Sequence, residues 1–328
     1  MAELTYRQAV AAGIAQEMDR DPLVVFIGED IGAAGGVFKT TEGLFERFGP
    51  ERIRDTPISE QAIVGAVMGA AMTGLRPIGE LMFSDFFAVA WDMVANQIAK
   101  TRYMTDGQVS LPLVLRTANG GGLRFGAQHS QSIESWAMAI PGLKVVAPAT
   151  PADMLGLMAA AIRDPDPVIV CEHKALFAIK GEVPDGEHVV PLGQAAIARA
   201  GTDCTIVALA AMVPRALEAA ERLAAEAGIS AEVIDLRTLI PLDARTILAS
   251  LAKTGRLFTV EENPRVLGWG AEIVSIAADE GFDSLDAPLV RITAPQVPLA
   301  SAAVLEDLAM PSVERISATV RRRLDAAR

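Results

Sequence analysis

The sequence predicts an α/β protein of two domains, each with helices layered on a mostly parallel sheet. Short continuous apolar runs, typical of strands buried on both faces, alternate with longer segments typical of helices. A chain of 328 residues is also long enough for two hydrophobic cores. The stretch from Lys180 to Gly193 is rich in Gly, Pro and charge, so we expect domains at 1–180 and 195–328 joined by a linker at 181–194.

The alternation of segments defines the elements expected in each domain. The first domain should contain strands at 23–27, 52–54, 76–82, 111–116, 143–148 and 168–171, with helices at 4–18, 63–72, 88–105 and 151–162. The second should contain strands at 205–209, 232–236, 257–260 and 289–292, with helices at 213–227, 244–253 and 270–280. Because most helices connect one strand to the next, neighbouring strands should be parallel. The basic run 321–323 should form the last turn of a helix.

Composition and charge exclude several classes of protein. Hydrophobic residues make up 51% of the chain, which is typical of a globular protein. The net charge of −12 and the lack of a basic stripe argue against nucleic acid binding. The chain starts without a secretory leader, and its apolar runs are too short to span a membrane. Because Cys171 and Cys204 lie far apart without metal-like spacing, we expect a reducing, cytoplasmic location.

The first candidate functional residue is the carboxylate of Glu60, at the end of the stretch 55–60. Pro57 favours a turn or a first helical position, and Thr56 or Ser59 can cap the helix that follows. A carboxylate held there could exchange a proton with a ligand nitrogen with little reorganisation. The alternative is an acidic residue that only complements the helix dipole, which contributes up to about 1 kcal/mol.

The helix behind Glu60 has very small side chains over much of its surface. Gly65, Gly69 and Gly74 are interspersed with alanines, and glycine inside a helix costs up to about 1 kcal/mol relative to alanine. We therefore expect this surface to pack closely against another helix or subunit.

Three phenylalanines, Phe83, Phe86 and Phe87, follow the end of the strand at 76–82. Only 5% of the chain is aromatic, so three such residues in five positions are a concentration. They could simply pack in the core. Alternatively they form a stacking wall for a flat heterocycle, since ligands bind at the carboxyl ends of strands in open α/β sheets.

A histidine, His129, follows the glycine-rich loop at 119–126 and has polar neighbours in sequence. It is either a proton-transfer residue or a residue that ties the loop down. The glycines at 28–36 and 119–126 match neither the dinucleotide fingerprint nor a P-loop. The polar residues 172–174 are expected to be a solvated strand end. The second domain has few paired ionisable residues beyond 261–263, so we expect it to serve packing and assembly.

Several motifs in order along the chain resemble one enzyme family. They are Gly-Glu-Asp at 28–30 with Gly-Gly-Val-Phe-Lys at 35–39, Asp-Thr-Pro-Ile-Ser-Glu at 55–60, Ala-Lys-Thr-Arg-Tyr-Met at 99–104, Ala-Gln-His-Ser-Gln at 127–131 and Pro-Gly-Leu-Lys-Val-Val at 141–146. With these motifs the chain resembles the beta subunit of the first component of 2-oxo acid dehydrogenase complexes. The resemblance implies a transketolase-like pyrimidine-binding domain followed by a transketolase C-terminal domain, in an oxidoreductase that transfers an acyl group to lipoamide.

The resemblance also assigns roles to individual residues. It implies that Glu60 bonds N1′ of the aminopyrimidine of thiamine diphosphate, that Phe86 stacks on this ring, and that Met82 lies beside it. It implies that His129 assists acyl transfer to the lipoyl arm. A potassium site is implied at Leu113, Ala161, Ile162, Asp164 and Asp166.

The chain lacks the Gly-Asp-Gly and Asn-Asn signature that binds magnesium and diphosphate in thiamine enzymes. The resemblance therefore implies that an alpha subunit holds these groups, in a heterotetramer of two alpha and two beta chains that docks on a lipoyl acyltransferase core. Alone, the beta chain should be inactive.

The substrate implied is acetoin ahead of pyruvate. Residues 120–124, 172–177 and 180–184 resemble acetoin dehydrogenase beta subunits, while Ile63 stands where an aromatic residue is common. Two alternatives stay open: a non-catalytic assembly subunit, and a nicotinamide-dependent oxidoreductase on a doubly wound sheet.

Overall fold

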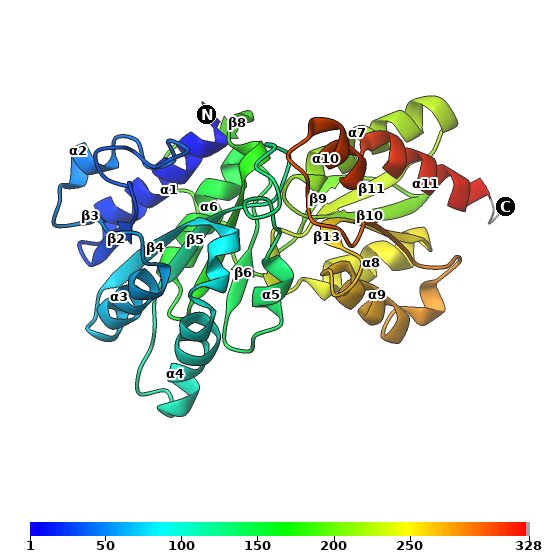
Figure 1. The fold of residues 1–328 in the computed structure, drawn as a ribbon. Coiled ribbons are helices and arrows are strands. Elements are labelled where there is room, and N and C mark those ends of the chain that lie inside the picture. Colours follow the sequence, from blue (N-terminus) through cyan, green and yellow to red (C-terminus); the bar gives the residue numbers. More distant parts are fainter. Residues whose placement is uncertain (326–328) are drawn as a thin grey trace.

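The computed structural model describes residues 1–325 and consists of two α/β units side by side (Figure 1). The first sheet has seven strands in the order β12 (Thr238–Ile240), β6 (Lys144–Val146), β7 (Val168–His173), β5 (Val114–Asn119), β4 (Arg76–Phe83), β2 (Val24–Gly28) and β3 (Ile53–Asp55). All of its strand pairs are parallel except β12 with β6.

The second sheet has five strands in the order β14 (Val290–Ala294), β13 (Leu257–Pro264), β10 (Cys204–Ala208), β11 (Ala231–Asp235) and β9 (Ala196–Arg199). Only β9 runs antiparallel to its neighbour. A separate antiparallel pair joins β1 (Ala2–Thr5) to β8 (Lys180–Val183). The α/β class predicted from the sequence is therefore confirmed.

Helices cover both faces of each sheet. The first unit has α1 (Tyr6–Arg20), α2 (Leu44–Phe48), α3 (Glu60–Met72), α4 (Ala99–Met104), α5 (Glu134–Met138) and α6 (Pro151–Arg163). The second has α7 (Met212–Ala227), α8 (Ala244–Thr254), α9 (Gly270–Asp279), α10 (Ala303–Ala309) and α11 (Val313–Asp325). Residues of α1 and α6 belong to one apolar cluster and those of α3 and α4 to another. Each cluster continues into the second unit, so the two units share their cores.

The helix expected at 88–105 is present from Trp91 to Met104, but it starts later than expected and is not a regular α-helix. A 3-10 turn, η1 (Ser84–Ala88), precedes it, and its middle is a π-helical segment, η2 (Met93–Ile98), that continues into α4. The apolar pattern of this segment is continuous. The register of its backbone hydrogen bonds, however, depends on packing against α3 and β4, and the local pattern holds no information about that packing. π-helical turns often occur near functional sites.

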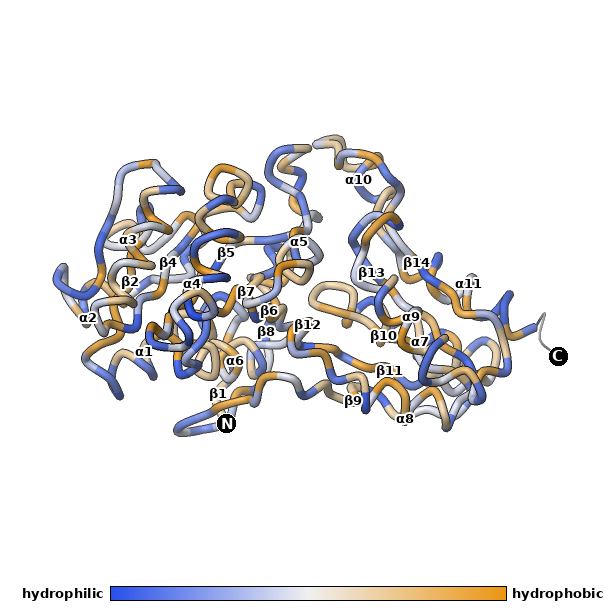
Figure 2. Tube along the Cα trace, turned by 90° about the horizontal axis from the view of Figure 1, so that it is seen from below, coloured by the Kyte–Doolittle hydropathy of each residue, from blue (hydrophilic) through white to orange (hydrophobic). Residues whose placement is uncertain are grey.

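Short elements that depend on distant partners were not expected from the sequence. β8 occupies the start of the expected linker, where it pairs with β1 at the other end of the first unit. β12 comes from the second half of the chain but extends the first sheet beside β6. Figure 2 shows β12 between the two units. The expected last turn at 321–323 does lie in α11, and none of the helices described is long and apolar enough to cross a bilayer.

A buried ion cluster lies at the centre of the first sheet. Arg116, 2% exposed, donates from Nε and Nη2 to the Glu172 carboxylate at 2.5 Å each, and from Nη1 to Glu80. Nη2 also donates to Thr40 Oγ1 at 3.0 Å. Two carboxylates around one guanidinium leave an excess negative charge. Burial raises the pKa of Glu80 to about 7, with a further rise from Glu172, although Arg116 lowers it.

The ion cluster predicts a pH dependence of stability. Since Glu80 binds its proton more tightly in the folded state than in the unfolded state, the free energy of unfolding should fall as pH rises from about 4.5 to about 7. Glu80→Gln should flatten this slope. Glu172→Gln should instead cost about 3 kcal/mol or more at every pH, because it breaks the two-bond pairing of Arg116. Urea unfolding at pH 5 and pH 7.5 measures both effects. An unchanged slope in Glu80→Gln would contradict the prediction.

Candidate active site

The candidate site lies at the carboxyl edge of the first sheet and is walled by aromatic rings. Phe83 ends β4, and its ring centroid lies 5.5 Å from that of Phe86 in η1. Phe38 and Phe125 meet Phe83 edge-on at 5.5 and 5.8 Å. We call Phe38, Phe83, Phe86 and Phe125 the aromatic cluster. Phe87 is fully buried in the core, so only part of the expected phenylalanine group forms this wall.

His129 stands against the aromatic cluster. Its ring centroid lies 4.7 Å from that of Phe83 and 5.4 Å from that of Phe86, nearly perpendicular to both. The ring is only partly buried, so a bound molecule could reach it. The structure thus brings together Phe86 and His129, which are far apart in sequence. Met82, also half-buried, lies in β4 just before the cluster.

Glu60 is the first residue of α3 and is half-buried. Ser59 occupies the N-cap position, but its side chain makes no capping hydrogen bond, and the Thr56 hydroxyl is buried without a partner among the described residues. The expected capping is therefore wrong. Thr56 instead donates its backbone N–H to Gly28 O at 2.9 Å, which fixes the turn before Glu60 to the end of β2.

Glu60 and Phe86 both lie at the carboxyl edge of the first sheet. Glu60 follows β3 and Phe86 follows β4, with β2 between these two strands. Two strand spacings correspond to about 10 Å, so the two segments that carry these side chains are near one another at this edge. Both side chains are half-buried, and their roles toward an aminopyrimidine stay a prediction.

A second carboxylate, Glu29, lies near Glu60 and was not singled out in the sequence. Glu29 follows β2, and burial, then the negative charges of Glu60 and Asp30, raises its pKa. Its position at the carboxyl end of a buried strand was the signal that could have found it.

The glycine face of α3 is only partly covered. A side chain at Gly65 would meet the Met93 methyl at 3.7 Å, whereas nothing lies within 4 Å of the position a Gly69 side chain would take. That distance is an ordinary van der Waals contact, so packing against η2 does not by itself require glycine at position 65. The open face at Gly69 agrees with the expected subunit contact, which stays a prediction.

The loop that carries His129 is held by the second unit. Glu262, in β13, accepts hydrogen bonds from the Gly121 N–H, from Ser132 Oγ at 3.1 Å and from His173 Nε2 at 2.6 Å. His173 carries its proton on Nε2 because Nδ1 accepts the Ala175 N–H. Burial alone would raise the pKa of Glu262, but His173 and the other donors outweigh it and lower the pKa to about 2.

Two expectations from the sequence are therefore corrected. Glu172, His173 and Lys174 are buried and do not form a solvated strand end. Glu172 pairs with Arg116, and His173 bonds Glu262 of the second unit. The second unit does more than pack: besides Glu262, Glu306 of α10 accepts the Gly122 N–H at 2.9 Å.

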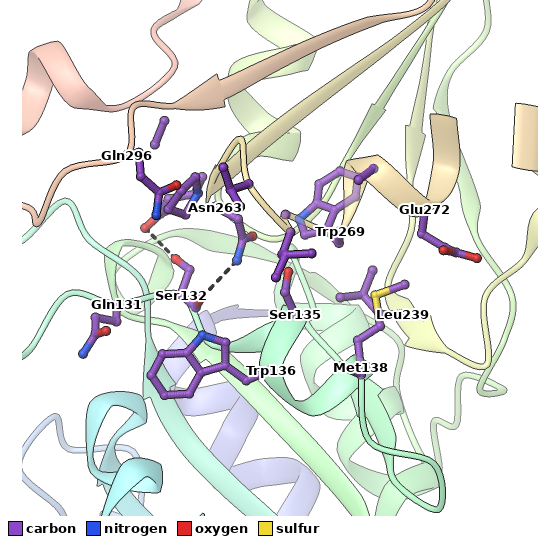
Figure 3. A pocket seen from close by; sticks show the side chains of 18 of the residues that line it. Gln131, Ser132, Ser135, Trp136, Met138, Leu239, Asn263, Trp269, Glu272 and Gln296 are labelled. Carbon is purple, nitrogen blue, oxygen red and sulfur yellow. Dashed lines mark hydrogen bonds between the residues drawn. The ribbon is translucent and has the colours of Figure 1, made fainter. Parts of the chain in front are cut away.

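A cavity of about 1180 Å³ lies between the two units and beside the candidate site. Figure 3 shows Trp136 and Trp269 on its walls and Asn263 reaching the backbone of Ser132, a hydrogen bond of 3.0 Å. Residues of the His129 loop border the cavity, but Glu60, Phe86 and His129 do not line it. The chemistry of the side chains, and not the size of this cavity, locates the candidate site.

The residues expected to bind potassium lie at the opposite, amino edge of the sheet, about 20 Å away along β5. Their oxygens already accept hydrogen bonds. Val168 N–H donates to Leu113 O at 3.0 Å, and Asp164 N–H donates to Ala161 O at 3.3 Å. The Arg76 guanidinium donates to Ile162 O at 3.0 Å and Asp164 O at 3.5 Å, while Asp166 pairs with Arg102 and Lys144.

Two sequence families match the chain in succession. "Transketolase, pyrimidine binding domain" matches residues 2–180, and "Transketolase, C-terminal domain" matches residues 193–316. A solved structure, "Split gene transketolase, inactive beta4 tetramer", covers 99% of this chain and 100% of its own, with a TM-score of 0.82 and 25% identity.

Two similar relatives have descriptive names. "Acetoin:2,6-dichlorophenolindophenol oxidoreductase subunit beta" of Cupriavidus necator is 47% identical over 98% of this chain and 97% of its own. "Pyruvate dehydrogenase E1 component subunit beta-1, mitochondrial" of Arabidopsis thaliana is 48% identical over 96% of this chain and 87% of its own.

Proposed function

The chain belongs to the family of beta subunits of thiamine diphosphate-dependent acetoin and 2-oxo acid dehydrogenases, on the transketolase fold, and from this premise we propose that its substrate is acetoin. With an alpha subunit it cleaves a C–C bond next to a carbonyl and transfers the acyl group to lipoamide. The single observation that supports the site assignment is that Glu60 and Phe86 both lie at the carboxyl edge of the first sheet, after β3 and β4 with β2 between them. Family membership leaves the nicotinamide-dependent alternative without support.

Thiamine diphosphate, when bound, supplies the carbon nucleophile that attacks the carbonyl of the substrate. In our proposal Glu60 holds a proton at the ring nitrogen N1′, while Phe86 stacks on the ring face and fixes its plane. The apolar rings of the aromatic cluster exclude water from the reacting carbon and strengthen these interactions. Glu29 adds a second carboxylate near Glu60, and burial together with the charge of Glu60 raises the pKa of Glu29.

His129 is proposed to give or take a proton during acyl transfer to the lipoyl arm. Its edge-on contact with Phe83 and Phe86 and its partial exposure support this role, because part of the ring is open to an incoming group. A neutral imidazole can serve as donor or acceptor near pH 7.

The partners follow from what this chain lacks. We propose that the alpha subunit holds magnesium and diphosphate, that two alpha and two beta chains assemble, and that the tetramer docks on a lipoyl acyltransferase core in the cytoplasm. The similar split-gene transketolase is named as an inactive beta tetramer, which parallels the inactivity expected for this chain alone.

Glu60→Gln, expressed with the alpha subunit, should lose at least about 100-fold in turnover, because general acid–base groups contribute about 10²–10⁴-fold. Assembly should be unaffected, since the Glu60 side chain takes part in no ion pair among residues 1–325. Steady-state turnover and gel filtration measure both. Glu51→Gln, at an exposed acid of the same unit, is the control and should keep full activity. Equal activity of the two variants would reject the role of Glu60.

Turnover by the reconstituted alpha–beta pair tests the substrate. We expect kcat/KM for acetoin to exceed that for pyruvate and for branched 2-oxo acids by about tenfold or more, a difference of about 1.4 kcal/mol in transition-state binding. Competition experiments with mixed substrates measure the ratio directly. A higher kcat/KM for pyruvate would leave the family unchanged but reject acetoin.

Potassium binding at the turn after α6 is a separate proposal. Rings of carbonyl oxygens suit this ion, but here it would share its oxygens with Arg76. Exchange of KCl for NaCl should therefore shift the thermal unfolding midpoint by less than about 2 °C, as expected of weak binding. A larger shift, specific to potassium, would show that the ion organises this turn.

A further inference from the structure

A lysine is buried beneath the aromatic cluster without a hydrogen-bond partner. Lys174, in the short 3-10 turn η3 (Lys174–Leu176), is 2% exposed, and its Nζ makes no hydrogen bond among the described residues. The ammonium lies 5.6 Å from the centroid of the Phe83 ring. Burial lowers the pKa of Lys174 to about 8, although four nearby carboxylates raise it. A buried cation of this kind requires a countercharge.

Among the four carboxylates that act on Lys174, three are already fully engaged. Both oxygens of Glu262, of Glu134 and of Glu306 accept hydrogen bonds from other groups. The fourth is Asp85, which is buried and whose Oδ2 accepts no hydrogen bond within residues 1–325. Asp85 is thus the one carboxylate of the four with an oxygen available to the lysine.

The other oxygen of Asp85 holds the His129 loop. Oδ1 accepts from Gln131 Nε2 at 2.8 Å and from the Gln131 N–H at 3.3 Å. The Ser84 hydroxyl donates to Gln131 O at 2.9 Å, so residues of η1 bond both the backbone N–H and the backbone carbonyl of Gln131. Gln131 is two residues from His129, and Asp85 is next to Phe86. One side chain therefore joins the segment that carries the aromatic ring to the segment that carries the histidine.

We propose that Asp85 and Lys174 form a buried positioning pair that holds the His129 loop against Phe86 during acyl transfer. Neither residue is assigned a contact with the reacting atoms. Asp85 tethers the loop and Lys174 supplies the charge that balances it from beneath Phe83. The tether is needed because the preceding segment contains Gly120, Gly122 and Gly126, each with positive φ, and has little intrinsic rigidity. This inference rests on the proposed function, since it concerns the step that His129 assists.

The test uses the complex assembled with its alpha subunit and two acceptors: a lipoyl domain, and the dye 2,6-dichlorophenolindophenol, which bypasses acyl transfer to the lipoyl arm. Lys174→Met should lower lipoyl-dependent turnover by about tenfold or more, and dye-linked turnover by at most about threefold. Asp85→Asn should behave similarly, because it removes the one carboxylate near Lys174 that has an oxygen without a hydrogen bond among the described residues. The double variant should recover much of the loss, since the neutral amide still accepts from Gln131.

Lys180→Met, at a lysine whose side chain is 65% exposed, is the matched control and should change neither activity. Hydrogen exchange of residues 126–132 gives a second readout that is independent of turnover. Exchange should accelerate in each single variant and return toward its original rate in the double variant.

Equal losses with both acceptors, or additive losses in the double variant, would overturn the positioning pair. Absence of turnover with either acceptor in the unaltered complex would instead reject the proposed function. In that case the exchange rates still decide whether Asp85 and Lys174 hold the loop.

Discussion

The buried carboxylate of Glu262 is the interaction on which the arrangement of the site depends. It reaches from β13 of the second unit and accepts hydrogen bonds from Gly121, Ser132 and His173 of the first. Gly121 and Ser132 lie before and after His129 in the chain, so the Glu262 side chain fixes both ends of the His129 loop. A buried carboxylate with three donors is stable, whereas removing it would leave several buried donors unsatisfied, at about 1–3 kcal/mol each. The second unit is therefore part of the active site through this contact, although the candidate catalytic groups all come from the first.

Two groups of charged residues are buried in the first unit. Arg116 with Glu80 and Glu172 lies within the first sheet, where its pairing ties the central strands together. Lys174 and Asp85 are buried near the carboxyl edge, and Lys174 lies beside the Phe83 ring. Because unpaired charges are so unfavourable in a low dielectric, each cluster allows few alternative arrangements. Rigid support of this kind keeps Phe86 and His129 in place without contacting them.

The chain leaves part of its site for another molecule to complete. Glu60 and Phe86 are proposed to hold the aminopyrimidine, but the chain carries no signature for the diphosphate and magnesium. The α3 surface at Gly69 has space for a close neighbour. In our proposal the cofactor is held between two polypeptides, which would couple assembly to activity, since neither chain alone would provide both ends of the binding site.

The sequence by itself determined the α/β class, most strand and helix positions, the family, and Glu60, Phe86 and His129 as candidates. Apolar runs and local motifs carry that information, because strand burial and turn chemistry act over a few residues. Only the tertiary structure decided that residues 172–174 are buried, that β12 joins the first sheet, and that the expected helix at 88–105 contains a π-helical segment. The tertiary structure alone also decided that Glu262 and Asp85 hold the His129 loop through hydrogen bonds. Each of these features depends on partners distant in the chain. From the sequence alone a charged residue is expected to be exposed, because the sequence does not identify the partner that permits its burial.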